Sequence, residues 1–450
     1  MTQQKSHQSI SNDGRPIIES NVTEALIDEK IEIQLSGLEP YQTVVLRAEM
    51  TDEAYTVWKS MATFKTDKHG KVDLGNQAPM LGSYNCVDAM GLFWSMFPQN
   101  ITNLDAFAKN NYSHFIKLKL DVPVKMVITA KVDSKSVAVL ELQRNFIAPD
   151  VTVKEIRRAG LVGWYYKPAG EGPYPGMLLL HGADGVPLHH EAALLASRGI
   201  ASFAVKYFSR QYNELPDHLN NMPLEYFKKA IKWMRDDGKC KKVALFGTSK
   251  GAEAVLLTAS LFPDIVDGVI VQAPSSVPLT GFKRKQPNHP PWLYEDEPLP
   301  YMPLSMWLGD KIFLATSLFL GLIPPMRKFY ARGNDNQVAL DKLAIRVENI
   351  TCPIFMACGD DDQTFPAKFH CDRIINRLRA HRFDYTYHYE IYRDAGHMFS
   401  YPYLPSSMSN YYKNPSKSCL VVGGNPESNA TAAVDFWKKT LNFMETHLST

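Results

Sequence analysis

The pattern of apolar and polar residues differs between the first third of the chain and the rest. Over the first third, short runs that alternate apolar and polar residues, or that are rich in β-branched residues, are separated by turn signals. A period of two places one face of a strand against a core and the other against solvent. These runs predict an antiparallel β-sandwich whose strands lie at residues 31–35, 43–50, 55–65, 115–132 and 137–146.

From about residue 154 the rhythm changes, and short apolar runs alternate with segments of helical periodicity. Such alternation is typical of a doubly wound, mostly parallel sheet, in which helices cover both faces of buried strands. We therefore predict a β-sandwich domain over residues 1–150 and an α/β domain over residues 151–450. The predicted strands lie at 176–180, 201–205, 243–246, 268–272, 353–358 and 386–392, and the predicted helices at 191–197, 224–235, 252–261 and 367–380.

Residues 275–345 interrupt this alternation with many prolines and aromatic residues. Because long connections in compact domains often form lids or binding elements, we predict an insertion or cap there. Its most apolar run, residues 312–326, is too short to span a bilayer. We interpret the run as a buried or cap helix, in preference to a segment that lies on a membrane surface.

Composition narrows the class of protein. With 450 residues, of which 45% are hydrophobic and 21% charged, the chain can bury a full core. A net charge of +2 without a long Lys/Arg run argues against a nucleic-acid partner. The six cysteines lack CxxC or Cys/His spacing, which indicates reduced thiols and no structural zinc. The sequence has neither a signal or transit peptide nor a C-terminal Ser-Lys-Leu, so we expect a cytoplasmic protein without a transmembrane segment, with the peroxisome as the alternative. Its oligomeric state stays open.

The strongest chemical signal is Gly247-Thr-Ser-Lys-Gly251, which follows an apolar strand and precedes a helix-forming run. This is the sequence form of a nucleophile elbow, in which a strained turn exposes a serine above a parallel sheet. Side chains at Gly247 and Gly251 would collide with neighbouring elements. The pattern predicts that Ser249 is a nucleophile on an α/β-hydrolase fold, and an ordinary strand–helix connection is the alternative.

A serine nucleophile needs a histidine base and a carboxylate that orients it, and α/β-hydrolases carry them in the chain order Ser, Asp/Glu, His. The strand at 353–358 leads into Asp360, Asp361 and Asp362, and spacing alone leaves open which of them is the orienting acid. His397 lies in the loop after the next predicted strand, so we predict that it is the base. A surface role for His397 is the alternative.

An oxyanion hole combines the backbone N–H of the residue after the nucleophile with one from the loop after the first hydrolase strand. These positions indicate Lys250 and, in Leu180-His-Gly-Ala-Asp-Gly185, Ala183. Gly182 would let this backbone turn inward. The alternative is an ordinary glycine turn.

With these residues identified, the chain resembles the type I acyl-CoA thioesterase and bile acid-CoA:amino acid N-acyltransferase family over most of its length. The resemblance implies an N-terminal β-sandwich over 1–150, an α/β-hydrolase catalytic domain over 151–450, and Asp362 as the acid. Residues 275–345 match the family poorly, and the loop at Ala183 is less glycine-rich than the family pattern. The matching segments are Leu35-Ser-Gly-Leu-Glu-Pro, Val45-Leu-Arg-Ala, Gly82-Ser-Tyr, Met90-Gly-Leu-Phe-Trp-Ser-Met, Gly247-Thr-Ser-Lys-Gly-Ala-Glu253, Gly359-Asp-Asp-Asp-Gln, Ala395-Gly-His-Met, Tyr401-Pro-Tyr, Gly423-Gly-Asn-Pro-Glu and Ala433-Val-Asp-Phe-Trp-Lys.

The resemblance also bears on the reaction. The conjugating members of that family carry a cysteine nucleophile, whereas this sequence has Ser249. An oxygen ester on serine is suited to hydrolysis by activated water, so we expect a thioesterase that hydrolyses fatty acyl-CoA to free fatty acid and CoA through Ser249, His397 and Asp362. We expect no cofactor and no metal, since CoA is part of the substrate. The alternatives are an acyl-CoA:amino acid N-acyltransferase, a carboxylesterase acting on oxygen esters, and an interaction protein that keeps the fold without activity.

Overall fold

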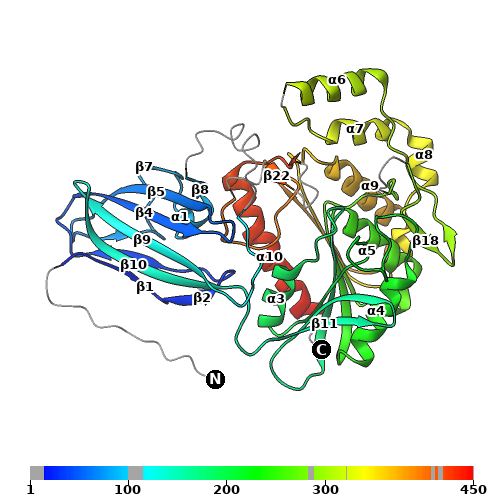
Figure 1. Ribbon diagram of the computed structural model, residues 1–450, viewed down its shortest axis with the longest axis horizontal. Coiled ribbons are helices and arrows are strands. Elements are labelled where there is room, and N and C mark those ends of the chain that lie inside the picture. Colours follow the sequence, from blue (N-terminus) through cyan, green and yellow to red (C-terminus); the bar gives the residue numbers. More distant parts are fainter. Residues whose placement is uncertain are drawn as a thin grey trace.

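The computed structural model of the protein describes residues 15–99, 115–281, 288–320, 322–406, 411–413 and 419–448. A sheet-rich region built from the first third of the chain lies beside a region in which helices surround a larger sheet (Figure 1). The strands of the first region end at Asn145, and the next strand begins at Thr152. The division at residue 150 itself stays a prediction.

Two sheets form the first region. The smaller has the order β1-β3-β6 and the larger the order β2-β10-β9-β4-β5-β7, with β8 paired to β5. Alternate residues of β4 are buried, as the period of two predicts. The bounds are β1 (Ile17–Ser20), β2 (Glu24–Leu26), β3 (Ile33–Ser36), β4 (Thr43–Thr51), β5 (Val57–Lys65), β6 (Val72–Asp73), β7 (Leu81–Gly82), α1 (Gly91–Trp94), β8 (Phe97–Pro98), β9 (Val124–Val132) and β10 (Lys135–Asn145).

The predicted strand at 115–132 is wrong in its first half, because β9 begins only at Val124. The carboxylate of Glu53 accepts the backbone N–H groups of Leu118 and Lys119, which diverts them from a sheet ladder. A turn closed by a hydrogen bond from Val122 N to Lys119 O follows. Side-chain acceptors of this kind compete with regular secondary structure.

The second region contains an eight-stranded sheet of order β11-β12-β14-β13-β16-β17-β20-β21. β12 pairs antiparallel with β11 and with β14, and all other pairs are parallel. This mostly parallel sheet confirms the predicted α/β-hydrolase fold, although β11 and β12 were not among the predicted strands. The bounds are β11 (Thr152–Arg158), β12 (Leu161–Lys167), β13 (Tyr174–Leu180), β14 (Ala201–Val205), β16 (Cys240–Thr248), β17 (Gly268–Gln272), β20 (Ile354–Gly359) and β21 (Tyr387–Tyr392).

Helices cover both faces of this sheet, which gives it two cores. On β13, Met177 and Leu179 join the core that also contains α3 (His189–Ser197) and α10 (Pro426–Leu448). Leu178 and Leu180 point to the other core. That second core contains residues of α4 (Glu225–Asp236), α5 (Lys250–Leu261) and α9 (Ala367–Ala380). Strands buried on both faces explain why these segments read as continuous apolar runs.

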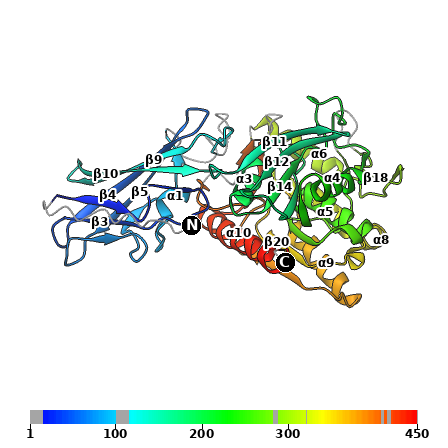
Figure 2. The same ribbon diagram turned by 90° about the horizontal axis from the view of Figure 1, so that it is seen from below.

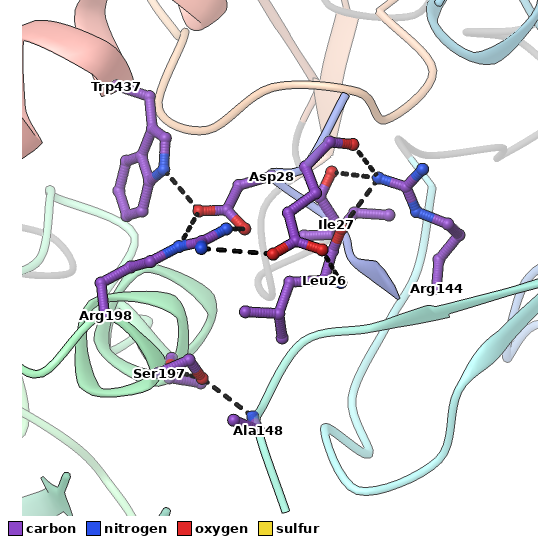
Figure 3. A network of polar contacts seen from close by, with 10 residues as sticks. Leu26, Ile27, Asp28, Arg144, Ala148, Ser197, Arg198 and Trp437 are labelled. Atoms are coloured by element: carbon purple, nitrogen blue, oxygen red, sulfur yellow. Dashed lines mark hydrogen bonds and ion pairs between the residues drawn. The ribbon is translucent and has the colours of Figure 1, made fainter. Parts of the chain in front are cut away.

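Helix α10 also faces the first region, beside α1 in Figure 2. There, Asp28 lies between two elements of the α/β region (Figure 3). Its Oδ1 is 2.7 Å from an amino group of Arg198, directly after α3, and its Oδ2 accepts from Trp437 Nε1 on α10 at 2.9 Å. The N–H of Ala148 donates to Ser197 Oγ at 2.8 Å. Charge-assisted bonds thus join the two regions where the chain passes from one to the other.

The segment at 275–345 forms small elements outside the eight-stranded sheet, and α6 (Leu308–Phe319) stands apart from it in Figure 1. The apolar side chains Leu308, Ile312 and Phe319 of α6 are exposed. Of the two predicted alternatives, a buried or a cap helix, the buried helix is therefore wrong and the cap stays a prediction. No described helix combines the length and the apolar character needed to cross a bilayer. The remaining elements are β15 (Met222–Pro223), η1 (Pro263–Ile265), β18 (Trp292–Tyr294), β19 (Glu297–Pro298), α7 (Arg327–Ala331), η2 (Arg332–Asp335), α8 (Gln337–Lys342), η3 (Val347–Asn349), β22 (Tyr411–Lys413) and β23 (Cys419–Val421).

Candidate active site

Ser249 occupies a sharp turn between β16 and α5. Its backbone has φ 53° and ψ −116°, a conformation that residues with a side chain rarely adopt. The turn fits only because its neighbours are glycines. A methyl group at Gly247 would lie 2.4 Å from Gly251 O, and one at Gly251 would lie 2.1 Å from Leu180 O. The structure therefore has the tight strand-to-helix turn that the motif predicts, with the serine at its apex.

A cavity of about 340 Å³ opens at this turn. Ser249 is partly exposed and lines it. A concave, largely apolar site with a few polar groups is typical of small-molecule binding. The other lining residues are Ala183, Asp184, Lys250, Glu253, Ala273, Ser275, Leu279, Thr280, Met326, Tyr330, Thr364, Phe365 and Leu420.

Of the three adjacent aspartates, the structure brings Asp362 to His397. Nδ1 of His397 lies 2.6 Å from Oδ2 of Asp362, and both side chains are buried. Oδ1 of Asp362 accepts two backbone N–H groups of the following turn, which fixes the carboxylate. Asp360 and Asp361 accept other backbone N–H groups instead. The geometry is that of a carboxylate holding an imidazole, while the catalytic roles stay predictions.

No hydrogen bond joins the Ser249 hydroxyl to His397 among the residues that the structure describes. The two residues are connected through Gln272, the last residue of β17. Gln272 O accepts the N–H of Ser249 at 2.8 Å, and Gln272 Nε2 donates to the carbonyl of His397 at 3.5 Å. Gln272 is fully buried and was not recognised from the sequence. The signal available was a polar residue at the end of an otherwise apolar strand, at the carboxyl edge of the sheet.

A glycine pair beyond β23 ties the two loops together. The N–H of His397 donates to Val422 O at 2.7 Å, and the N–H of Gly424 donates to Asp361 Oδ2 at 2.9 Å. Gly423 and Gly424 have φ values of 79° and 77°, which side chains disfavour. A methyl group at Gly423 would lie 1.9 Å from Asp361 O. We call Val422, Gly423 and Gly424 the glycine clamp.

The predicted oxyanion residues Ala183 and Lys250 both line the cavity beside Ser249. A methyl group at Gly182 would lie 3.8 Å from Ser249 Cβ, so this loop passes close to the serine. Gly185 of this loop has a positive φ, at 72°. The assignment of Ala183 and Lys250 N–H groups as oxyanion donors stays a prediction.

The side chain of Lys250 forms a buried ion pair that sequence reasoning missed. Its Nζ lies 2.7 Å from Glu253 Oε1, and both side chains are excluded from solvent. Trp292 Nε1 donates to the same oxygen at 2.7 Å, and the N–H of Leu279 donates to Glu253 Oε2 at 3.1 Å. Burial lowers the pKa of Lys250 and raises that of Glu253, while the ion pair opposes both shifts. The network joins the elbow to residues of the 275–345 segment.

A second cavity of about 310 Å³ lies between the two regions and shares Asp184 with the first. Lys117 lines it from the first third of the chain, and Glu191 and Tyr401 line it from the α/β region. Burial raises the pKa of Glu191 to about 7, although Ser400 donates a hydrogen bond to it. Within the described ranges, no group of three or more His, Cys, Asp or Glu side chains is placed to hold a metal ion.

Both regions match known families. Residues 28–158 match the family described as "Acyl-CoA thioester hydrolase/BAAT N-terminal region", and residues 222–450 match "BAAT / Acyl-CoA thioester hydrolase C terminal". A solved structure, Pyrococcus horikoshii acylaminoacyl peptidase, matches with a TM-score of 0.43 and 12% identity, covering 94% of this chain and 60% of that chain. We assign the fold from the strand order of the eight-stranded sheet, and not from this similarity.

Two curated relatives cover nearly the whole chain. Acyl-coenzyme A thioesterase 5 of Mus musculus is 28% identical over 435 residues, covering 94% of both chains. Bile acid-CoA:amino acid N-acyltransferase of Mus musculus is 29% identical over 434 residues, covering 94% of this chain and 96% of that protein. The C-terminal family model matches more than half of this chain. The chain therefore belongs to the family of acyl-CoA thioester hydrolases and bile acid-CoA:amino acid N-acyltransferases.

Proposed function

We propose that the protein is an acyl-CoA thioesterase that hydrolyses fatty acyl-CoA to a free fatty acid and CoA. The observation that carries this proposal is the serine at the nucleophile position. Ser249 sits in a strained turn at the cavity, and an imidazole held by Asp362 follows in the expected chain order. Hydrolases that act through serine need these three groups.

In the proposed cycle, His397 takes the proton of Ser249 as Oγ attacks the thioester carbonyl. The N–H groups of Lys250 and Ala183 hold the resulting oxyanion. The C–S bond then breaks, and the sulfur of CoA takes the proton from His397. In the second half, His397 removes a proton from water, which attacks the acyl-serine, and returns it to Ser249 as the fatty acid leaves. Asp362 holds the imidazole in the required tautomer throughout.

Two other enzymatic outcomes remain to be separated from this one. An acyl-CoA:amino acid N-acyltransferase would pass the acyl group to an amine, and a carboxylesterase would accept oxygen esters in place of acyl-CoA. Serine at position 249 favours water as acceptor, because an acyl-serine is an oxygen ester and less reactive toward amines than a thioester. The match of residues 28–158 to the N-terminal family region favours acyl-CoA over simple esters.

The decisive experiment measures CoA release from short, medium, long and branched acyl-CoA by the wild type, Ser249→Ala and Ser275→Ala. Ser275 is the matched control, because it lines the same cavity but donates its hydroxyl to Val277 O. We expect loss of about 10⁴-fold or more in kcat for Ser249→Ala and a minor change for Ser275→Ala. Mass spectrometry of the fluorophosphonate-treated protein should place the adduct on Ser249.

The same assays distinguish the alternatives. CoA release that rises with added glycine or taurine and yields an N-acyl product would assign the transferase. Turnover of simple esters without turnover of acyl-CoA would assign the esterase. If the protein turns over neither acyl-CoA nor esters and fluorophosphonate does not label it, a catalytic role for this site is rejected.

A further inference from the structure

Helix α6 and the residues beside it expose an unusual amount of apolar surface. Trp307 is 66% exposed, Leu308 74%, Ile312 57% and Phe319 88%. Isolated apolar side chains are common on protein surfaces, but Leu308, Ile312 and Phe319, spaced by four and seven residues, share one face of the helix. Several exposed apolar side chains on one face mark a contact site. We call this set, extended by two further exposed leucines, the α6 apolar surface; it consists of Trp307, Leu308, Ile312, Phe319, Leu320 and Leu322.

Two polar side chains of α6 are turned away from solvent. Asp310 and Ser317 are buried, while the apolar residues around them are exposed. Asp310 forms a two-point ion pair with Arg332, at 2.6 and 2.8 Å, and also accepts the N–H of Trp307. The guanidinium of Arg332 lies 4.4 Å from the centroid of the Trp307 ring. These bonds fix the helix with its apolar side chains outward, in the opposite sense to a helix that packs on a core.

Positive charge accompanies this surface. Lys311 is exposed on α6, and Lys328 is exposed at the start of α7, with its ammonium group 4.0 Å from the centroid of the Phe313 ring. Asp310 is the only acidic residue of α6, and Arg332 neutralises it. Neither Lys311 nor Lys328 has an ion pair within the described part of the chain. Apolar side chains with adjacent lysines are the composition of helices that lie at the surface of an anionic bilayer.

Length fixes how such a helix would sit. Twelve residues of α-helix extend about 18 Å, well short of the roughly 30 Å hydrocarbon core of a bilayer. The helix would therefore lie along the interface. The following segment leads to the cavity, where Met326 and Tyr330 contribute to the wall that also contains Ser249. The α6 apolar surface is thus joined to the mouth of the cavity by a few residues of chain.

We propose that the α6 apolar surface docks the protein on the surface of a bilayer that contains anionic phospholipids. The apolar side chains enter the headgroup and acyl-chain boundary, and Lys311 and Lys328 contact the anionic headgroups. A second copy of the chain fits less well, because two such faces would bring like charges together. The proposal concerns binding alone and stands independently of the proposed function.

The test is flotation of the full-length protein with vesicles of phosphatidylcholine alone or with added phosphatidylserine. We expect the wild type to float with the phosphatidylserine vesicles, and less so at high salt. The double variant Leu308→Ser/Phe319→Ser should lower the binding constant about tenfold or more. Lys311→Gln should lower it about fivefold on phosphatidylserine vesicles and leave binding to phosphatidylcholine unchanged.

Leu81→Ser is the matched control, because Leu81 is 71% exposed but lies on β7 in the first region. It should bind vesicles like the wild type. Circular dichroism of each variant checks folding, which these exposed positions should not disturb. Failure of the wild type to float would overturn the proposal, as would equal binding of the wild type and the double variant. Equal binding to both kinds of vesicle would overturn the anionic requirement. Self-association lost in the double variant, without vesicle binding, would assign the surface to a second copy.

Discussion

His397 and Asp362 lie 2.6 Å apart, Nδ1 to Oδ2, although 35 residues separate them in the chain. Each sits in a loop at the carboxyl end of a parallel strand, β20 for the aspartate and β21 for the histidine. Neighbouring parallel strands bring their carboxyl ends to one edge of a sheet, which is where α/β proteins place their sites. The pair is therefore a direct product of the strand order.

Substitution of the adjacent aspartates should distinguish the role of Asp362 from that of its neighbours. Asp362→Asn keeps the size of the side chain but removes the charge that stabilises the imidazolium, so kcat for acyl-CoA hydrolysis should fall about 10⁴-fold. Asp361→Asn is the control, since an amide oxygen can still accept the N–H of Gly424. Steady-state kinetics of both variants check this. A larger loss of kcat for Asp361→Asn than for Asp362→Asn would show that Asp361, and not Asp362, orients His397.

The elbow glycine should tolerate no side chain. Gly251→Ala would place a methyl group 2.1 Å from a backbone oxygen of β13, which cannot move without shifting a central strand. We expect a loss of 3 kcal/mol or more in the free energy of unfolding, on the order of other buried overpacking changes. Gly182→Ala meets only contacts of 3.7 Å or longer and should cost less than about 1 kcal/mol. Urea unfolding of the two variants compares them, and equal losses would contradict the explanation.

The effect of Glu253→Gln on the free energy of unfolding should change sign when the cation of Lys250 is removed. Lys250→Met leaves a buried carboxylate without its cation and should lower the free energy of unfolding by about 3 kcal/mol. Adding Glu253→Gln should recover much of this loss, because glutamine is neutral and still accepts from Trp292 Nε1. In the wild-type background the same Glu253→Gln change should be destabilising. A double-mutant cycle in urea measures the coupling, and additive effects would contradict it.

The buried Glu191 predicts a dependence of stability on pH. Its pKa is raised from 4.5 to about 7 in the folded protein, because burial disfavours the charged form. Between these values the unfolded chain has lost the proton and the folded chain keeps it, so stability falls as pH rises from about 4.5 to 7. Glu191→Gln should remove this fall and be more stable than the wild type at pH 8, relative to pH 4.5, by about 3 kcal/mol.

Glu214→Gln provides the opposite case. The hydrogen bond from Arg157 lowers the pKa of Glu214, so its contribution is present above the unfolded pKa and is lost as pH falls. Unfolding curves of the wild type and both variants at pH 3, 4.5, 6 and 8 test the two signs together, because the contribution of Glu214 is lost below pH 4.5 and that of Glu191 changes above it. A wild-type profile that matches Glu191→Gln at every pH would show that the pKa of Glu191 is not raised in the folded protein.

The sequence was sufficient for the strands that carry the site. Runs such as 201–205 and 268–272 are apolar throughout because both faces of the sheet are covered, and they coincide with β14 and β17. β11 was missed because its burial pattern is nearly all exposed, as expected for an edge strand with little apolar signal. The exposure of α6 was not predictable from its composition, since an apolar run does not reveal which side faces the protein.

Within the site, local motifs succeeded and distant contacts did not. The elbow at Ser249 is encoded by five consecutive residues, so its strained backbone could be predicted. Which aspartate contacts His397 depends on how the turn after β20 is capped, and residue order alone leaves this open. Trp292 contacts Glu253 across 39 residues of chain, and Gln272 contacts His397 across a longer separation. No local sequence pattern encodes either contact.

The glycine clamp has a consequence for the order in which the protein is made. A nascent chain synthesised only as far as His397 already contains all the residues proposed to react. It does not yet contain Val422 or Gly424, which hold the N–H of His397 and the carboxylate of Asp361. These bonds can hold the loops of His397 and Asp361 only after the ribosome has added the segment that leads into α10. Until then, the emerging polypeptide contains the residues proposed to react without the contacts that fix their loops.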